Sequence, residues 1–407
     1  MVSVALSRYR NVLALPGVSG LMVLMFLARI PLTADSMVLT LHVVLGLHHG
    51  YGAAGLAGAM VTIGMAFGAP VLGRLVDSIG LRWMLVIATV GDGAFWLTAG
   101  QFSYSVLLVT AFVGGLLALP VMSIGRQAIA ALVPEDQRRS AYSLDSISTE
   151  MSYMVGPALG VLVATRASTD VALVTVGVAT VLSGIAIYLV NPRVRGDDEQ
   201  RDPSIPPPPR RSWLRGSLIS VLAINFGAVF VLAGVEVAVV AALRTSGQVG
   251  WTGVVTIAMC VASATGGVIY GVLHKAPGSA VLLGLMSLLL IPVVLAGGQW
   301  WVLSLVLAPT SMLCAPTLAS TGEAVSRLAP AAVRGEAMGL HSSSLTLGAA
   351  LGSPVIGTMV DRFGAPGGFF AASLGGVLIS ALVLVFGRRP PGITPAEPVD
   401  EASAVAG

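Results

Sequence analysis

Charged residues are scarce in this chain. They make up 10% of its 407 residues, against roughly 25% in soluble domains, whereas hydrophobic residues make up 55%. So few charges cannot cover the surface of a soluble protein of this length, and the composition therefore excludes an ordinary water-soluble domain. Lipid is expected to surround most of the side chains. The formal net charge of +3 is too small to indicate an acidic partner.

Cysteine and the common catalytic motifs are also scarce or missing. The two cysteines, Cys260 and Cys314, lie in apolar runs, which favours buried apolar side chains over a disulfide or a metal site. The sequence has no P-loop, which argues against ATP-driven pumping. It has no HExxH motif, no Cys/His cluster and no recognisable nucleophile–base pair, so we expect no metal, no cofactor and no enzyme activity. No basic surface with interleaved aromatic residues indicates nucleic-acid binding.

Apolar runs long enough to cross a bilayer, at roughly 20 residues each, are abundant. The first follows Arg8 and Arg10 and is too long for the core of a signal peptide. The sequence therefore predicts an all-helical transmembrane protein of twelve helices. Six spans are expected in the first half, at 17–45, 52–76, 82–100, 104–132, 142–165 and 171–190, and six in the second, at 217–243, 250–273, 279–297, 300–326, 336–360 and 367–387.

The two halves repeat each other at an offset of 196 residues. Segment 132–144 has an echo in 328–340, in which Pro, Arg, Ala and Leu recur in register. The same offset pairs Pro120 with Pro316, Ser146 with Ser342, and Gly156 with Gly352. Two homologous halves in a membrane protein place a substrate path at their interface, so the repeat indicates transport.

The repeat also predicts the domain organisation. A six-helix bundle is expected over 1–190 and a second, pseudo-symmetric one over 217–390. Between them, 191–216 contains four consecutive prolines, which favour an extended cytoplasmic linker. A Pro-rich recognition segment is the alternative. The tail, 391–407, is expected to be disordered.

Basic residues are distributed unevenly between the two ends of the predicted spans. Of the 22 Lys and Arg residues, 17 fall on the side of the N-terminus, while Arg29 and Arg126 lie within spans. The opposite side has only Arg166, Arg244 and Arg362. Because basic loops stay in the cytoplasm, we expect both termini and the linker there, and the chain in the plasma or inner membrane.

Glycine pairs with GxxxG spacing recur in the same two spans of each half. This spacing lets helix backbones approach closely in lipid, so the pairs are candidates for the contact between the bundles. They are Gly64 and Gly68, Gly156 and Gly160, Gly267 and Gly271, and Gly348 and Gly352, in the second, fifth, eighth and eleventh spans.

The loop after the second span reads GRLVDSIGLR over residues 73–82. It resembles the G-x-L-A-D-R-x-G-R-R signature of the major facilitator superfamily, at the place where that family carries it, although Ser78 and Leu81 replace basic residues. The fold that this resemblance implies extends over the whole chain. The resemblance implies two six-helix bundles that rock about a central cavity, with spans 2, 5, 8 and 11 at their interface.

In that family this loop holds the cytoplasmic side of the transporter closed. The resemblance therefore implies a gating role for Gly73, Asp77, Gly80 and Arg82. Glycine permits the tight turn, and a carboxylate can pair with an arginine or meet a helix N-terminus. Arg126 is the expected partner of Asp77. An ordinary turn with solvated charges is the alternative.

The fifth span contains Gly156, Pro157 and Gly160, which resemble part of the G-x-x-x-G-P-x-x-G-G signature of drug/proton antiporters. A second antiporter signature, R-x-x-Q-G in the fourth span, is absent, because its arginine position holds Ala111. The resemblance to antiporters is therefore partial.

Ionisable residues within spans are the candidates for coupling, because a charge at membrane depth costs roughly 2.5 to 3.5 kcal/mol. They are Arg29, Asp35, Asp92, Glu150 and Glu236. The family resemblance implies that spans 1, 4, 7 and 10 line the cavity, which ranks Arg29, Asp35 and Glu236 highest. A buried carboxylate can bind and release a proton near neutral pH, and two of them attract a cationic substrate.

Structural roles are the alternative for each of these residues. Arg29 can pair permanently with Asp35 or Glu236, and Asp92 and Glu150 can tie helices inside one bundle. Three further polar residues rank lower. Asp145 and Glu323 lie near helix ends, where side chains reach the interface cheaply. His341, which the 196-residue offset pairs with Asp145, is expected to be hydrogen-bonded structure, with a proton relay as the alternative.

The sequence thus predicts a secondary transporter, functional as a monomer, which exports a small amphipathic or drug-like molecule in exchange for protons. A facilitator or importer of a small metabolite on the same fold is the first alternative. A non-transporting membrane receptor or scaffold is the alternative from another class. The lipid bilayer and a small molecule are the only partners expected.

Overall fold

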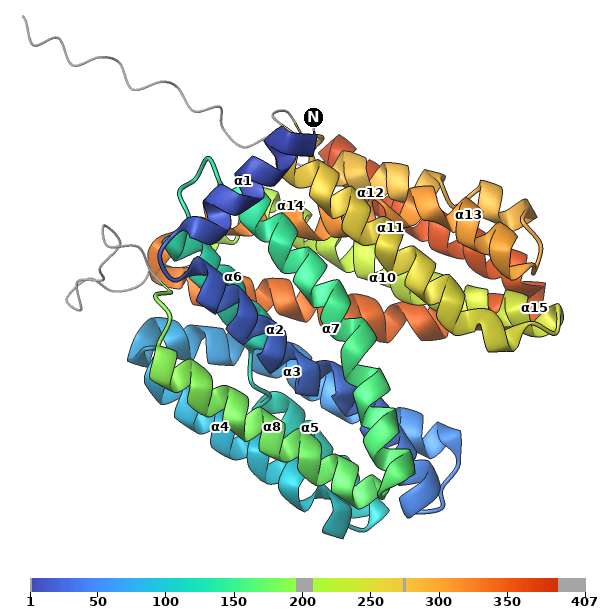
Figure 1. Ribbon diagram of the computed structural model, residues 1–407, viewed down its shortest axis with the longest axis horizontal. Helices are drawn as coiled ribbons and strands as arrows, with labels where there is room; N and C mark the ends of the chain where they lie inside the picture. Colours follow the sequence, from blue (N-terminus) through green and yellow to red (C-terminus); the bar gives the residue numbers. More distant parts are fainter. Residues whose placement is uncertain (1, 195–207, 274–275, 387–407) are drawn as a thin grey trace, which may run out of the picture.

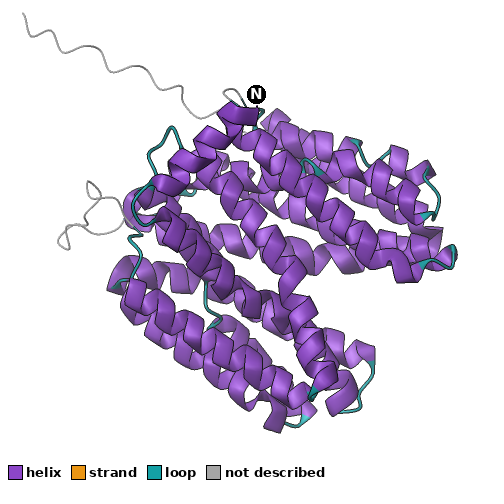
Figure 2. Ribbon diagram, in the orientation of Figure 1, coloured by secondary structure: helices purple, strands orange, loops and turns teal. Residues whose placement is uncertain are grey.

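The computed structural model describes residues 2–194, 208–273 and 276–386. Within these ranges the chain consists of helices joined by short connections and contains no strand (Figure 2). Residues 195–207 of the predicted linker and the predicted tail, 391–407, lie outside the described residues. The expected all-helical fold is confirmed.

The first half of the chain begins with a short helix that precedes the first span. Its helices are α1 (Val2–Ala14), α2 (Val18–Leu41, continued by a π-helix over His42–Gly46), α3 (Tyr51–Ile79), α4 (Leu81–Thr98), α5 (Tyr104–Leu116), α6 (Val121–Leu132), α7 (Arg138–Arg166) and α8 (Thr169–Val190).

The second half begins with a single helical turn at the end of the linker. Its helices are α9 (Arg210–Trp213), α10 (Gly216–Thr245), α11 (Thr252–Val272), α12 (Ser279–Leu288), α13 (Trp300–Ser311), α14 (Cys314–Leu328) and α15 (Arg334–Phe386).

The expected twelve spans are present in the described residues. Ten apolar segments are long enough to cross a membrane, and Ser279–Leu295 forms a shorter one. One of the ten, Ala331–Phe386, contains two helices, because Gly364 has a φ of 69° and kinks α15 there. The fourth span is broken between α5 and α6, and the tenth between α13 and α14.

Two bundles form from the two halves. In the first, α2 packs on α7 and α8, α3 on α5, and α4 on α8; in the second, α15 packs on α10 and α12, and α11 on α13. Helices α3 and α7 of the first bundle contact α15 and α11 of the second. Spans 2, 5, 8 and 11 therefore form the interface, as expected.

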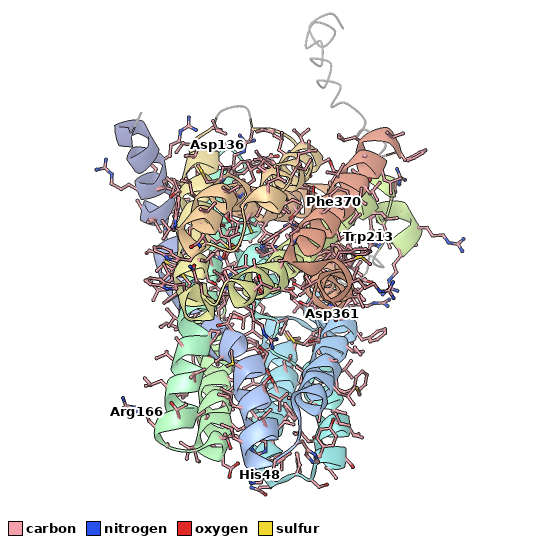
Figure 3. The ribbon with its side chains drawn as sticks, turned by 90° about the vertical axis from the view of Figure 1, so that its right-hand side faces the viewer. His48, Asp136, Arg166, Trp213, Asp361 and Phe370 are labelled. Atoms are coloured by element: carbon pink, nitrogen blue, oxygen red, sulfur yellow. The ribbon has the colours of Figure 1, made fainter. Side chains whose placement is uncertain are left out.

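The bundles meet at one end and diverge toward the other. Figure 1 shows them joined on the left and separated on the right. Figure 3 looks toward the diverging ends and places His48 and Arg166 on the first bundle, below, and Asp361 and Phe370 on the second, above. We call the joined end, which carries the loops around Arg74, Arg138 and Arg334, the basic face, and the other end the opposite face.

Two short helices fasten the basic face. In α1, Tyr9 donates a hydrogen bond to the Val268 carbonyl in α11, at 2.7 Å, and so connects the two halves. In α9, the Trp213 side chain is 5% exposed and packs in a cluster with Val325, Val333 and Met338. Neither helix was predicted, because each is too short to produce a span-length apolar run.

Candidate transport site

Asp77 joins the bundles at the basic face. Its Oδ1 accepts a hydrogen bond from the backbone N–H of Gly335 at 3.1 Å, and its Oδ2 accepts one from that of Glu336 at 2.8 Å. Both donors lie in the first turn of α15, where the helix dipole favours a negative charge. The Asp77 carboxylate therefore meets a helix N-terminus, one of the two arrangements expected for it.

Glycines bring the two backbones together beside Asp77. A Cβ placed on Gly73 would lie 2.2 Å from the Gly335 carbonyl oxygen, and one on Gly335 would lie 2.4 Å from the Gly73 oxygen. One turn further along α15, a Cβ on Gly339 would lie 2.3 Å from the Ala69 oxygen. Since a real Cβ cannot come this close, these positions require glycine when the basic face is closed.

The remaining motif residues shape the first bundle. Gly80 has a φ of 88°, which lets α3 end and α4 begin without a longer loop. The Arg82 guanidinium lies 5.4 Å from the centre of the Tyr188 ring, a cation–π contact between α4 and α8. Arg82 thus connects two helices of the same bundle.

The first predicted interface pair, Gly64 and Gly68, does not face the second bundle. A Cβ on Gly64 would lie 2.2 Å from the Phe112 carbonyl oxygen, in α5 of the same bundle. The same prediction for Gly68, that it lies at the contact between the bundles, is also wrong. A Cβ on Gly68 would lie 2.1 Å from the Leu116 oxygen, again in α5. Gly68 therefore seals α3 against α5, because the two glycines lie one turn apart on the same helix face.

Two further pairs were also assigned wrongly to the interface. Gly156 and Gly160 pack on α2, where a Cβ on Gly156 would lie 2.7 Å from the Ile30 oxygen. Gly348 and Gly352 pack on α10 of their own bundle, with Phe226 and Phe230 as the nearest residues. Like the first pair, they close contacts within one bundle, since GxxxG spacing indicates a close helix contact without naming the partner helix.

The pair Gly267 and Gly271 does face the other bundle, against Ile147 and Ser143 of α7. Ser140 donates a hydrogen bond to the Gly271 carbonyl there at 2.6 Å. For this pair the predicted interface role is confirmed.

Pro157, which belongs to the partial antiporter signature, lies inside α7. The helix continues through it to Arg166.

Arg29, Arg126 and Asp145 form a buried ionic cluster in the first bundle. Arg29 forms an ion pair with Asp145, and their side chains are 0% and 1% exposed. Arg126 Nε lies 3.5 Å from Asp145 Oδ2. We expected Arg126 to pair with Asp77, and Arg29 to pair with Asp35 or Glu236 as one alternative; the structure gives both arginines a different carboxylate.

Asp145 is the residue that the sequence argument discounted wrongly. Its position near a helix end suggested a side chain that reaches water, but α7 packs on α2, α6 and α14, and the Asp145 side chain is 1% exposed. One signal could have found it, because the 196-residue offset pairs Asp145 with His341, and both residues contact Arg126.

Three carboxylates, Asp35, Glu150 and Glu236, all lie within electrostatic reach of one side chain, Tyr153, which is 51% exposed. Asp35 accepts a hydrogen bond from the neighbouring Ser36 N–H, and Glu150 accepts one from Ser263 Oγ at 3.2 Å. Within the described residues, Glu236 makes no hydrogen bond, and none of the three carboxylates has an ion pair. We call these residues the acidic group.

Asp92 has a structural contact of its own. Its Oδ2 accepts a hydrogen bond from the Leu119 N–H at 2.9 Å, at the break between α5 and α6. The side chain is 5% exposed and lines one pocket inside the first bundle together with Asp35, Phe95 and Trp96. Asp92 therefore supports the broken fourth span.

Comparison with known proteins agrees with this geometry. The sequence profile described as Major Facilitator Superfamily matches residues 21–278. The chain belongs to the major facilitator superfamily. Members of this family are membrane transporters of small molecules, so the chain is a multi-pass transporter and not an enzyme.

One curated member of the superfamily shares a short stretch with the chain. It is the uncharacterised MFS-type transporter YtbD of Bacillus subtilis (strain 168), 30% identical over 114 residues. The match spans 27% of this chain and 28% of that relative.

Solved structures of other members share the fold. The human organic anion transporter MFSD10 (TETRAN) has a TM-score of 0.73 at 19% identity, covering 92% of this chain and 99% of that one. The proton:xylose symporter XylE has a TM-score of 0.69 at 15% identity, covering 91% and 96%. The fucose:proton symporter FucP of E. coli has a TM-score of 0.67 at 15% identity, covering 92% and 98%.

Proposed function

We propose that this major facilitator protein exports a small amphipathic or drug-like molecule in exchange for protons, by alternating access. The acidic group is the observation that carries the proposal. Charges at membrane depth are expensive, and these three carboxylates have no ion pair with a cationic side chain in the described part of the chain. Either protons or a cationic substrate would supply the missing charge.

Competition between these two cations leads to exchange. A carboxylate that has bound a proton no longer attracts a cationic substrate, and a bound cation disfavours the proton. If both use Asp35 and Glu236, each excludes the other, so that the entry of one accompanies the exit of the other. An organic anion would be repelled by the same group unless the carboxyls were protonated.

The position of the acidic group suits a central site. The hydrogen bonds that join the bundles in the described residues extend from the acidic group, where Ser263 of α11 donates to Glu150 of α7, to the basic face, where Asp77 accepts from the Glu336 N–H. Beyond them Glu236 is exposed, and the bundles diverge toward the opposite face (Figure 1). We take the basic face as cytoplasmic, so this conformation would be closed to the cytoplasm and would admit substrate from outside.

Transport in proteoliposomes with an imposed pH gradient tests the proposal. Ethidium, a planar lipophilic cation, is the first probe, followed by compounds to which overexpressing cells become resistant. We expect Asp35→Asn and Glu236→Gln each to abolish gradient-driven transport. Asp361→Asn is the matched control, because this exposed carboxylate lies outside the acidic group. Unchanged transport in both test variants would show that the proton role is wrong.

Import is the second candidate function. Two proteins that share the fold are proton symporters by name, and the antiporter signature of the fourth span is absent. A symporter would accumulate substrate on the side toward which protons flow, and an exchanger on the side from which they come. The direction of accumulation therefore separates the two candidates.

A further inference from the structure

His341 connects the two bundles by a hydrogen bond that depends on its protonation state. It lies in α15 and is 1% exposed, and its Nδ1 is 2.8 Å from Nη1 of Arg126 in α6. A guanidinium can only donate hydrogen bonds, so the nitrogen that faces it must accept. An imidazole has an accepting nitrogen only when it is neutral. The contact therefore requires neutral His341.

Side chains of the second bundle favour the neutral tautomer in which His341 Nε2 carries the proton and Nδ1 accepts. His341 Nε2 lies 3.1 Å from Thr321 Oγ1, and Thr321 Oγ1 lies 3.3 Å from Asn225 Oδ1. Asn225 Nδ2 in turn donates to the His341 carbonyl at 2.9 Å. The Nε2–H thus has an acceptor, and Nδ1 remains available to Arg126. All three side chains are buried and belong to one bundle.

Charges around His341 oppose its protonation in this conformation. From the first bundle, α6 presents Arg126, α2 presents Arg29, and α7 presents Asp145 together with Tyr142, whose hydroxyl donates to the Arg126 carbonyl. The elements of the second bundle present Thr321 from α14 and Asn225 from α10, which are neutral. One carboxylate already serves two guanidinium groups, so a proton on His341 would create a third cation.

We infer that His341 is a proton-sensitive latch, which holds the basic face closed while it is neutral and releases it when it is protonated. Protonation converts the Arg126–His341 hydrogen bond into a repulsion between two cations across the bundle interface. Separation of the bundles removes that repulsion, so protons favour the conformation that is open at the basic face. The inference rests on the proposed function, in which protons enter the space between the bundles and bind the acidic group. It adds His341 as a second group that binds a proton.

The test measures conformation rather than transport. Spin labels are attached at Ser78→Cys, at the end of α3, and Arg327→Cys, at the end of α14, which are exposed positions on different bundles at the basic face. Cys260→Ser and Cys314→Ser remove the other thiols. Distances are recorded by double electron–electron resonance in nanodiscs, without substrate or gradient, from about pH 8 to about pH 5, where an ordinary histidine titrates.

Acidification is expected to lengthen the distance between the labels in the parent protein. His341→Gln keeps an oxygen that can accept from Arg126 but cannot be protonated, so the distance should stay short at both ends of the pH range. His341→Lys adds a permanent cation, and the distance should be long throughout.

Ser343→Ala is the matched control, because it removes another hydrogen bond between α15 and α3 without a titrating group. It should favour opening at every pH yet retain the pH response. Arg126→Gln gives an independent check: without the guanidinium charge the response should weaken.

A parent protein whose distances do not change with pH, or a His341→Gln variant that opens on acidification as the parent does, would overturn the inference. The double variant Asp35→Asn with Glu236→Gln distinguishes this result from failure of the proposed function. It should lose gradient-driven transport but keep the opening that depends on His341.

Discussion

At the scale of single residues, the two groups of buried charges have different chemistry. Arg29, Arg126 and Asp145 neutralise one another in part and are almost completely excluded from solvent. The acidic group has no such partner among the described residues. Charges that are paired within a bundle hold its helices together, whereas unpaired carboxylates remain available to protons and substrate. The pairing of Arg29 and Arg126 with Asp145 is therefore expected to stabilise the first bundle, and the acidic group is the candidate for coupling.

Removal of the shared carboxylate is expected to destabilise the fold. In Asp145→Asn, two buried guanidinium groups lose their only carboxylate within the cluster, which costs about 3–5 kcal/mol for a broken buried pair. Thermal unfolding in detergent should therefore show a clearly lower midpoint. Asp136→Asn, at an exposed loop position, is the control and should leave the midpoint unchanged. Equal midpoints for the two variants would mean that the cluster adds no stability.

At the scale of helices, glycines perform two separate tasks. The pairs at GxxxG spacing in spans 2, 5 and 11 close contacts between helices of the same bundle. The glycines at the basic face, Gly73, Gly335 and Gly339, permit a close contact between the bundles, which the proposed alternating access would have to break and reform. The position of a glycine along its helix thus decides whether it serves the fold or the gate.

A methyl group at the gate should prevent closure and spare the fold. In Gly335→Ala the new Cβ would meet the Gly73 oxygen at 2.4 Å, so the closed basic face cannot form as it stands. The spin-label pair at Ser78 and Arg327 should report a longer distance, with an unfolding midpoint close to that of the parent.

Gly357→Ala provides the control in the same helix, since a Cβ there meets nothing within 4 Å. It should leave the distance unchanged. The assignment of Gly335 to the gate would be refuted by a closed distance in Gly335→Ala.

At the scale of the whole molecule, the arrangement combines a closed basic face with bundles that diverge toward the opposite face (Figure 1). The Asp77 contact, the glycine contact and the Arg126–His341 bond all lie on one side of the acidic group. Under the proposed function the central site would be exposed to one side of the membrane at a time, and the distribution of basic residues predicts that the basic face is the cytoplasmic side.

Thiol labelling from outside the cell checks this assignment. In a background that carries Cys260→Ser and Cys314→Ser, a membrane-impermeant maleimide should label Arg166→Cys on intact cells. Asp136→Cys should react only after permeabilisation, because its loop is on the basic face. The reverse pattern would place the basic face outside, contrary to the distribution of arginines.

The twelve spans, the duplication and the Asp77 motif could be read from the sequence because each is local. Hydropathy along one run determines whether that run enters lipid, and a repeat or a turn motif is visible as a string of letters. For the same reason the sequence identified Arg29, Asp35, Asp92, Glu150 and Glu236 as ionisable residues within spans, although it placed Asp145 too near a helix end to count it among them.

The sequence did not show which helix packs against each GxxxG glycine pair. The spacing of Gly64 and Gly68 shows that some helix approaches α3 closely, but only the packed bundle shows that this helix is α5 and not one from the second bundle.

The partners of the buried charges were likewise decided only by the tertiary structure. Arg29 pairs with Asp145 across 116 positions, and Arg126 contacts His341 across 215. The energy of a buried charge depends on which opposite charge or acceptor the packing of other helices brings to it, and no local pattern encodes that choice. For this reason Asp145 and His341 were recognised only once the bundles were in place.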